Sequence, residues 1–169
     1  MAIETLNSAK VKLALLCCAV GFVIQVIAFA SPYWFTGYNI HGGLWLVCGA
    51  GTCVAAPDGL PSVFHWVQAL EAIAFIFSVL GIGVVAWFLF NPSPFKMRLC
   101  QSFFITAGAL TIIGAVTFLA KILDDKAWAV YIEFPAGVGL LLAGLFSWSE
   151  YRRLHSASEY LPVLGSNNK

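Results

Sequence analysis

Hydrophobic residues in this chain gather in long blocks rather than in short alternating stretches. The blocks run from about Leu13 to Ala30, Ala72 to Phe90, Phe103 to Ala120 and Ala129 to Trp148. At about 1.5 Å per helical residue, each can cross a hydrocarbon core of about 30 Å. Because the alternation of a β-barrel is missing, helices must satisfy the backbone inside lipid. The pattern predicts an all-α membrane protein, built as a four-helix transmembrane bundle.

We place the predicted spans at residues 13–30, 66–90, 101–121 and 128–148, all in one domain of residues 1–169. The composition agrees, since 60% of the residues are apolar, 10% are charged and the mean hydropathy is +0.87. Soluble domains are about 45–50% apolar and about 25% charged. An ordinary soluble domain is therefore excluded, and we expect membrane lipids, and no nucleic acid, as partners.

The positions of the basic residues predict the orientation. Seven of the nine lysines and arginines lie on one side of the predicted spans: Lys10, Lys12, Lys96, Arg98, Arg152, Arg153 and Lys169. The positive-inside rule then places both termini and a polar, flexible tail (149–169) in the cytoplasm, with loops 31–65 and 122–127 outside. A cleaved signal peptide is the alternative for the first span, but its apolar run of about 18 residues exceeds the usual length of about 7–15.

The first outer loop carries Cys48 and Cys53, the only cysteines on the predicted outer side. Disulfides persist in that compartment. Gly49 and Gly51, between them, permit the positive φ angles of a tight turn, and strand-forming residues flank the pair. We therefore expect a short β-hairpin pinned by a Cys48–Cys53 disulfide. The alternative is two free thiols or a metal pair.

The same loop contains Trp34 and the tripeptide Gly43-Leu44-Trp45. Tryptophans here suit either an interfacial belt or a packed loop. Together with Cys48 and Cys53, in the first outer loop of a four-span protein, these residues resemble the W–GLW–C–C signature of the claudin superfamily, which includes the peripheral myelin and epithelial membrane proteins. The start of the second span, "WVQALEA" at residues 66–72, resembles the myelin branch as well.

The resemblance implies a left-handed four-helix bundle with a small extracellular antiparallel sheet. It assigns Trp34, Leu44 and Trp45 to anchoring that sheet on the bundle. It also implies a plasma-membrane protein that organises junctions or cell–cell contacts by lateral self-association and by contacts of its outer loops. The alternative is an auxiliary subunit of an ion channel or receptor. Because Asp58 is the only charge in the first outer loop, a charge-selective pore is not expected.

Three polar residues fall within the predicted spans: Gln25, Glu71 and Glu133. A charge at the bilayer centre costs about 2.5–3.5 kcal/mol or more, so each residue needs a partner. We expect hydrogen bonds between helices. The competing interpretation is an ion or proton site.

Small residues recur at four-residue spacing on the last two spans: Ala107, Thr111, Ala115, Gly139 and Ala143. Such spacing lets helices approach closely, either within the bundle or between subunits. Cys17, Cys18 and Cys100, near the predicted cytoplasmic face, are candidates for palmitoylation, with ordinary apolar packing as the alternative. We find no catalytic, cofactor-binding or metal-binding motif, and we expect a non-enzymatic protein.

Overall fold

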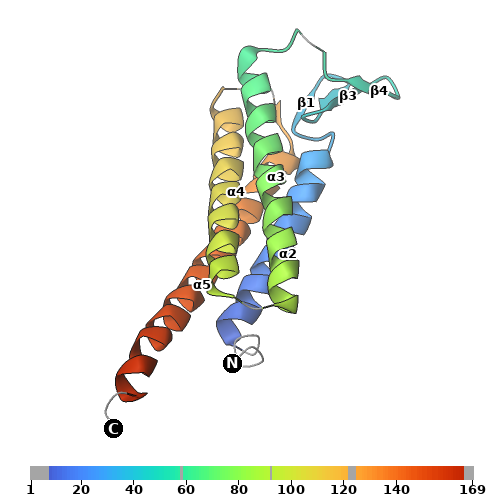
Figure 1. Ribbon diagram of the computed structural model, residues 1–169. Helices are drawn as coiled ribbons and strands as arrows, with labels where there is room; N and C mark the ends of the chain where they lie inside the picture. The colour runs from blue at the N-terminus through green and yellow to red at the C-terminus, as the bar shows by residue number, and fades with distance from the viewer. Residues whose placement is uncertain (1–7, 58, 92, 122–124, 166–169) are drawn as a thin grey trace.

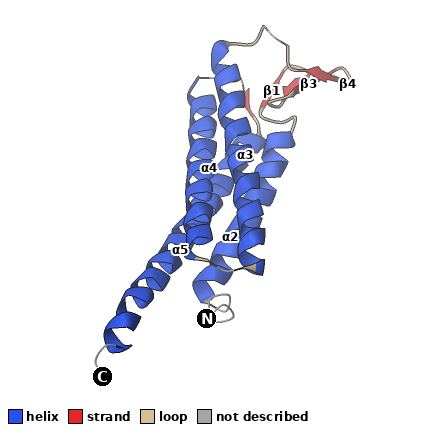
Figure 2. Ribbon diagram, in the orientation of Figure 1, coloured by secondary structure: helices blue, strands red, loops and turns tan. Residues whose placement is uncertain are grey.

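The protein consists of four long helices with a small sheet at one end (Figures 1 and 2). The computed structural model describes residues 8–57, 59–91, 93–121 and 125–165. The helices are α2 (Ala9–Ala30), α3 (Ser62–Phe90), α4 (Pro94–Lys121) and α5 (Trp128–Gly165). All four are long and apolar enough to cross a membrane. The chain is therefore a membrane protein with four candidate spans, as the hydrophobic blocks predict.

The helices extend beyond the predicted spans. Helix α4 begins at Pro94, because proline is well suited to the first helical position, where its missing N–H has no partner to lose. Helix α5 continues to Gly165, so the part of the predicted tail up to residue 165 is helical. Neither glycine nor proline interrupts residues 149–161, and Arg153 pairs with Glu150 one turn earlier, at 3.3 Å. Figure 1 shows this part of α5 running past the other helices, at the end opposite the sheet.

Helix α5 packs closely along both α2 and α4, and glycines mark the crossings. A Cβ atom added to Gly139 would lie 3.1 Å from the Cα atom of Gly21 in α2. One added to Gly108 in α4 would lie 2.6 Å from the carbonyl oxygen of Gly137 in α5. At both crossings the backbones themselves are in contact.

Helices α2 and α3 touch at far fewer points. Large side chains bridge them instead, with Phe75 of α3 stacked on both Phe22 and Phe29 of α2. The ring centroids are 5.9 Å and 4.8 Å apart. The bundle therefore has one loose seam, filled by aromatic rings rather than closed by backbone contact.

The sheet is antiparallel, with five strands in the order β4-β3-β2-β1-β5. Its strands are β1 (Phe35–Gly37), β2 (Ile40–Gly42), β3 (Leu46–Gly49), β4 (Thr52–Ala55) and β5 (Asp125–Lys126). The first four lie within loop 31–65, where a small sheet is predicted. The fifth comes from loop 122–127, for which no strand is predicted, and it joins the two loops into one sheet.

Candidate functional site

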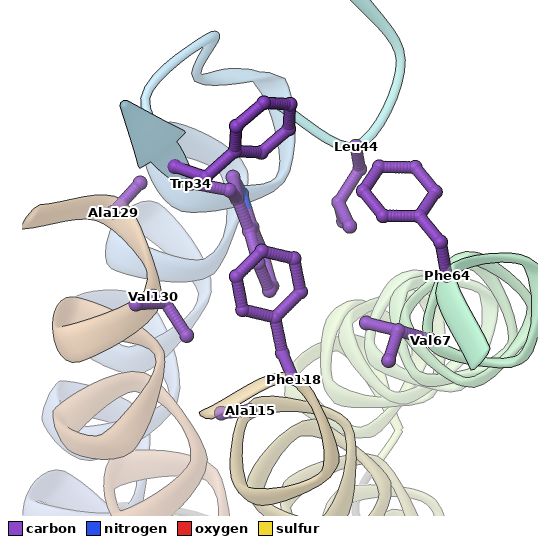
Figure 3. Close-up of a cluster of buried hydrophobic side chains, with 9 residues drawn as sticks. Trp34, Leu44, Phe64, Val67, Ala115, Phe118, Ala129 and Val130 are labelled. Atoms are coloured by element: carbon purple, nitrogen blue, oxygen red, sulfur yellow. The ribbon is translucent and has the colours of Figure 1, made fainter. Parts of the chain in front are cut away.

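We call residues 33–56, which contain β1 to β4, the lid. Trp34 fastens it to the bundle. The Trp34 side chain is fully buried and donates a hydrogen bond from its indole Nε1 to the carbonyl oxygen of Ala28, at 2.8 Å. That carbonyl oxygen lies in the last turn of α2 and also accepts a hydrogen bond from the backbone N–H of Ser31, at 3.2 Å. The indole also meets the Phe118 ring of α4 edge-on, with centroids 5.1 Å apart. Figure 3 shows Trp34 directed between the helices.

Gly43 and Leu44 form the second fastening point. A side chain at Gly43 would collide with the carbonyl oxygen of Ser31 and would lie 2.8 Å from the Cα atom of Pro32. Only glycine lets the lid backbone come this close to the end of α2. Leu44 next to it is fully buried beside Phe64 (Figure 3). Its carbonyl oxygen accepts a hydrogen bond from the Gln68 amide of α3.

Trp45 lies differently from Trp34. Its side chain is 38% exposed and packs at a tilt on Phe29 of α2, with ring centroids 5.1 Å apart. It therefore covers the outside of the bundle, on the side of the seam between α2 and α3. Of the three anchors that the resemblance assigns, Trp34 and Leu44 enter the bundle and Trp45 rests on its flank.

The structure confirms the Cys48–Cys53 disulfide. The two residues face each other across β3 and β4, and Ala50 and Gly51 form the two-residue turn. Positive φ angles occur at Ala50 (49°) and Gly51 (82°) but not at Gly49, which corrects that part of the prediction. Gly49 has another role, because a Cβ atom there would lie 3.0 Å from the Ile40 side chain of β2.

The far side of the lid is exposed. Tyr38, at the turn between β1 and β2, is 95% exposed, and Asn39 beside it adopts a positive φ of 58°. Ile40 and Val54 are 46% and 61% exposed. No Asp, Glu, Lys or Arg occurs within the lid. The lid thus offers a neutral surface with apolar and aromatic side chains.

The polar residues inside the bundle form two groups. Gln25 of α2 is fully buried and donates from Nε2 to the Thr111 hydroxyl of α4, at 3.0 Å. It accepts a hydrogen bond from the Ser78 hydroxyl of α3, at 2.7 Å. Three helices are joined through one amide, and the expected interhelical hydrogen bonds are present there.

Glu71 of α3 and Glu133 of α5 are the second group. Both side chains are fully buried, and none of their four carboxyl oxygens has a hydrogen-bond partner in the part of the chain described. The expectation of interhelical hydrogen bonds is therefore wrong for these two residues. The sequence shows that a carboxyl group falls within a span, but it does not show whether a donor lies opposite.

The small residues of α4 and α5 face the interior of the bundle. Ala107, Thr111, Ala115 and Ala143 are all buried, and Gly139 contacts α2. The sequence interpretation missed Gly21, Gly108 and Gly137, which make the closest backbone approaches. Gly108 and Gly137 do not belong to the four-residue repeats of small residues, and Gly21 lies on the first span, for which no such repeat is predicted.

The three cysteines outside the lid are free thiols. Cys18 and Cys100 are buried and line a small cavity of about 30 Å³ between the helices, whereas Cys17 is half-buried. The prediction of acylation therefore applies best to Cys17. Among the described residues, no three His, Cys, Asp or Glu side chains gather closely enough to hold a metal ion.

No protein-family model matches the chain. Two curated relatives are similar to part of it, the phospho-N-acetylmuramoyl-pentapeptide-transferases of Thermotoga petrophila and Thermotoga maritima. Each is 26% identical over 106 residues, which covers 52% of this chain and 34% of the relative. The chain thus spans about a third of the length of the relatives it matches.

Proposed function

We propose that this chain is a claudin-like structural membrane protein, which acts at contacts between cells. It associates with its own copies within the membrane and meets apposed membranes through the lid. The observation that carries the proposal is the structural role of the six signature positions, which are Trp34, Gly43, Leu44, Trp45, Cys48 and Cys53. Trp34, Gly43 and Leu44 fix one side of the lid to the bundle, and the Cys48–Cys53 disulfide fixes the hairpin beyond it. Such a lid can present a defined surface without further support.

The neutral surface of the lid favours contact over ion selection. Two apposed lids would bury no carboxylate, ammonium or guanidinium group on meeting, because residues 33–56 contain no Asp, Glu, Lys or Arg. Tyr38 and its exposed neighbours supply the amphipathic and apolar area that protein interfaces use at their centres. A charge-selective pore would need ionised groups at this surface.

We further propose that the lid lies outside the cell and that both termini lie in the cytoplasm of a plasma-membrane protein. The distribution of lysine and arginine supports this orientation. A disulfide within the lid also supports it, because disulfides persist outside the cytosol.

The partial similarity to two transferases does not lead us to propose an enzyme. Transmembrane segments use few residue types, so unrelated spans match at many positions by composition alone. The match also leaves about two thirds of each transferase without a counterpart here. A non-enzymatic role remains our proposal.

The test is imaging of contacts between cells that lack junctions of their own. Cells that express the tagged protein are mixed with cells that do not. The variants are Cys48→Ser/Cys53→Ser, which removes the disulfide, and Tyr38→Ser, which changes the most exposed lid side chain. Cys100→Ser is the matched control, because it removes a buried thiol far from the lid.

We expect enrichment only where two expressing cells touch, with loss in both lid variants and not in Cys100→Ser, at equal surface levels. A uniform surface signal in every pairing would contradict the adhesion proposal. Co-purification with a larger channel or receptor, whatever the contacts, would then favour the auxiliary-subunit alternative.

A further inference from the structure

Glu71 and Glu133 are buried acidic residues whose negative charge no described residue offsets. Both carboxyl groups are fully buried and all four oxygens lack hydrogen-bond partners among the described residues. They occupy the same level of the bundle, because Glu71 lies against Gly114 of α4, and Gly137 of α5, one turn from Glu133, contacts Ile112 in the same part of α4. Removing an ionised carboxylate from water is costly, and a second one beside it adds repulsion. A positive charge must therefore neutralise the pair.

The position of the pair is defined by the packing of three helices. Glu71 of α3 lies against Gly114 of α4, where an added Cβ atom would be 3.1 Å from the carboxyl carbon of Glu71 and would collide with its Oε1. Glu133 approaches from α5. Ala115, which follows Gly114 in α4, and Val130, about one turn before Glu133 in α5, belong to the apolar cluster beneath the lid. The pair is thus enclosed by helices on its sides and by the lid cluster above it.

No basic residue of the described chain pairs with these carboxyl groups. The nearest basic residues along the surrounding helices are His65 of α3 and Lys121 of α4. His65 contacts Gln68 instead, at 3.0 Å, and Lys121 is exposed at the end of its helix. Helix α2 has its lysines at the opposite end, and the arginines of α5 lie there too. Lys126, just before α5, lies in β5 opposite Phe35. Within the described part of the chain, no basic residue supplies the neutralising charge.

We propose that Glu71 and Glu133 form an intramembrane binding site for small monovalent cations, protons or Na⁺. A divalent ion fits less well, since Ca²⁺ takes about 6–8 oxygen ligands and no third His, Cys, Asp or Glu joins the pair among the described residues. A proton needs a single oxygen, and Na⁺ can share the two carboxylates. The occupant is held beneath the apolar cluster of the lid, so its binding stabilises the packing of the surrounding helices. This site does not depend on the adhesion proposal.

The test measures the thermal unfolding midpoint of the purified full-length protein in detergent. One series varies Na⁺ against choline at fixed pH and ionic strength, and a second varies pH in choline alone. Glu71→Gln/Glu133→Gln is the variant. Glu150→Gln is the matched control, because Glu150 is a buried acid of α5 whose carboxyl group is paired with Arg153.

A ligand that binds only the folded protein raises the midpoint as its concentration grows. We expect such a rise for the wild type and for Glu150→Gln, and none for the double variant. A rise with Na⁺ at fixed pH identifies Na⁺, and a rise only as pH falls identifies the proton. Identical responses of wild type and double variant to both series would overturn the site.

A second measurement keeps the proposal testable if the double variant does not fold. The unmodified protein is examined by infrared spectroscopy for the carbonyl band of a protonated carboxyl group at neutral pH, and by equilibrium binding of radioactive Na⁺. We expect one of the two signals. The absence of both would show that the pair carries no cation and would refute the proposal.

Discussion

Gly43 shows how a single residue controls the seating of the lid. Its missing side chain lets the backbone of the lid touch Ser31 and Pro32 at the end of α2. Leu44 can then enter the bundle, and Trp34 can reach the carbonyl oxygen of Ala28. The Gly-Leu-Trp motif is therefore a packing requirement as well as a family resemblance.

We predict that Gly43→Ala destabilises the protein by about 1–3 kcal/mol, the usual cost of overpacking. The neighbouring atoms are backbone, which cannot turn aside as a side chain can. The measurement is thermal unfolding in detergent, together with the rate at which a protease cuts the lid.

Gly59→Ala is the matched control, because a Cβ atom at Gly59 would meet nothing within 4 Å. Equal stability of the two variants would show that the lid does not need the close approach at Gly43. Faster cutting of the lid in Gly43→Ala alone would agree with the structure.

Much of the lid can be predicted at the level of single residues, and some of it cannot. The disulfide follows from two cysteines on one predicted side of the membrane. The lack of hydrogen-bond partners for Glu71 and Glu133 does not follow, because a linear sequence does not show which donors lie on the facing helices. The positive φ at Ala50 is missed for a related reason. Strand-forming residues beside Cys48 and Cys53 predict the two strands, but they do not show which residues form the turn between them.

At the scale of helices, glycine positions decide which pairs come close. Helix α5 reaches backbone contact with α2 through Gly21 and Gly139, and with α4 through Gly108 and Gly137. In lipid, helices associate through van der Waals packing and interhelical hydrogen bonds rather than through the hydrophobic effect. These glycine contacts are therefore a main source of bundle stability.

We expect Gly108→Ala to lower stability by about 1–3 kcal/mol, because the new methyl group would push α4 away from α5. The measurement is unfolding of the purified protein in a denaturing detergent. Gly83→Ala in α3 is the comparison, since nothing lies within 4 Å of its added Cβ atom. At that position alanine should be neutral or should stabilise the helix by up to about 1 kcal/mol. A loss of stability in Gly83→Ala equal to that in Gly108→Ala would argue against the packing explanation.

The element boundaries are less predictable than the elements. Hydrophobic blocks locate the four helices because lipid requires long apolar stretches. The blocks do not show that α5 continues through polar residues to Gly165, since a helix outside the membrane needs no apolar run. Strand β5 has only two residues, too few for any pattern, and pairs with β1 only because the fold brings the two loops together.

At the scale of the whole molecule, the sheet and the far end of α5 lie at opposite ends of the bundle (Figure 1). An epitope tag inserted between Ala50 and Gly51, at the exposed turn of β3 and β4, should bind antibody on intact cells. A tag after Lys169 should bind only after permeabilisation. The reverse result would contradict the proposed orientation, and accessibility of both tags on intact cells would contradict an even number of spans.

The loose seam between α2 and α3 has a consequence for how the protein is made. Of the four helices, α2 is made first, yet its close partner is α5, which is made last of the four. Helix α2 must therefore wait in the bilayer, only loosely held by the helix that follows it, until α5 has been made. A substitution at Gly21 would leave membrane insertion intact and would disturb this docking step. The defective chains would then have all four helices in the membrane, and cellular quality control would recognise them only after α5 has been inserted.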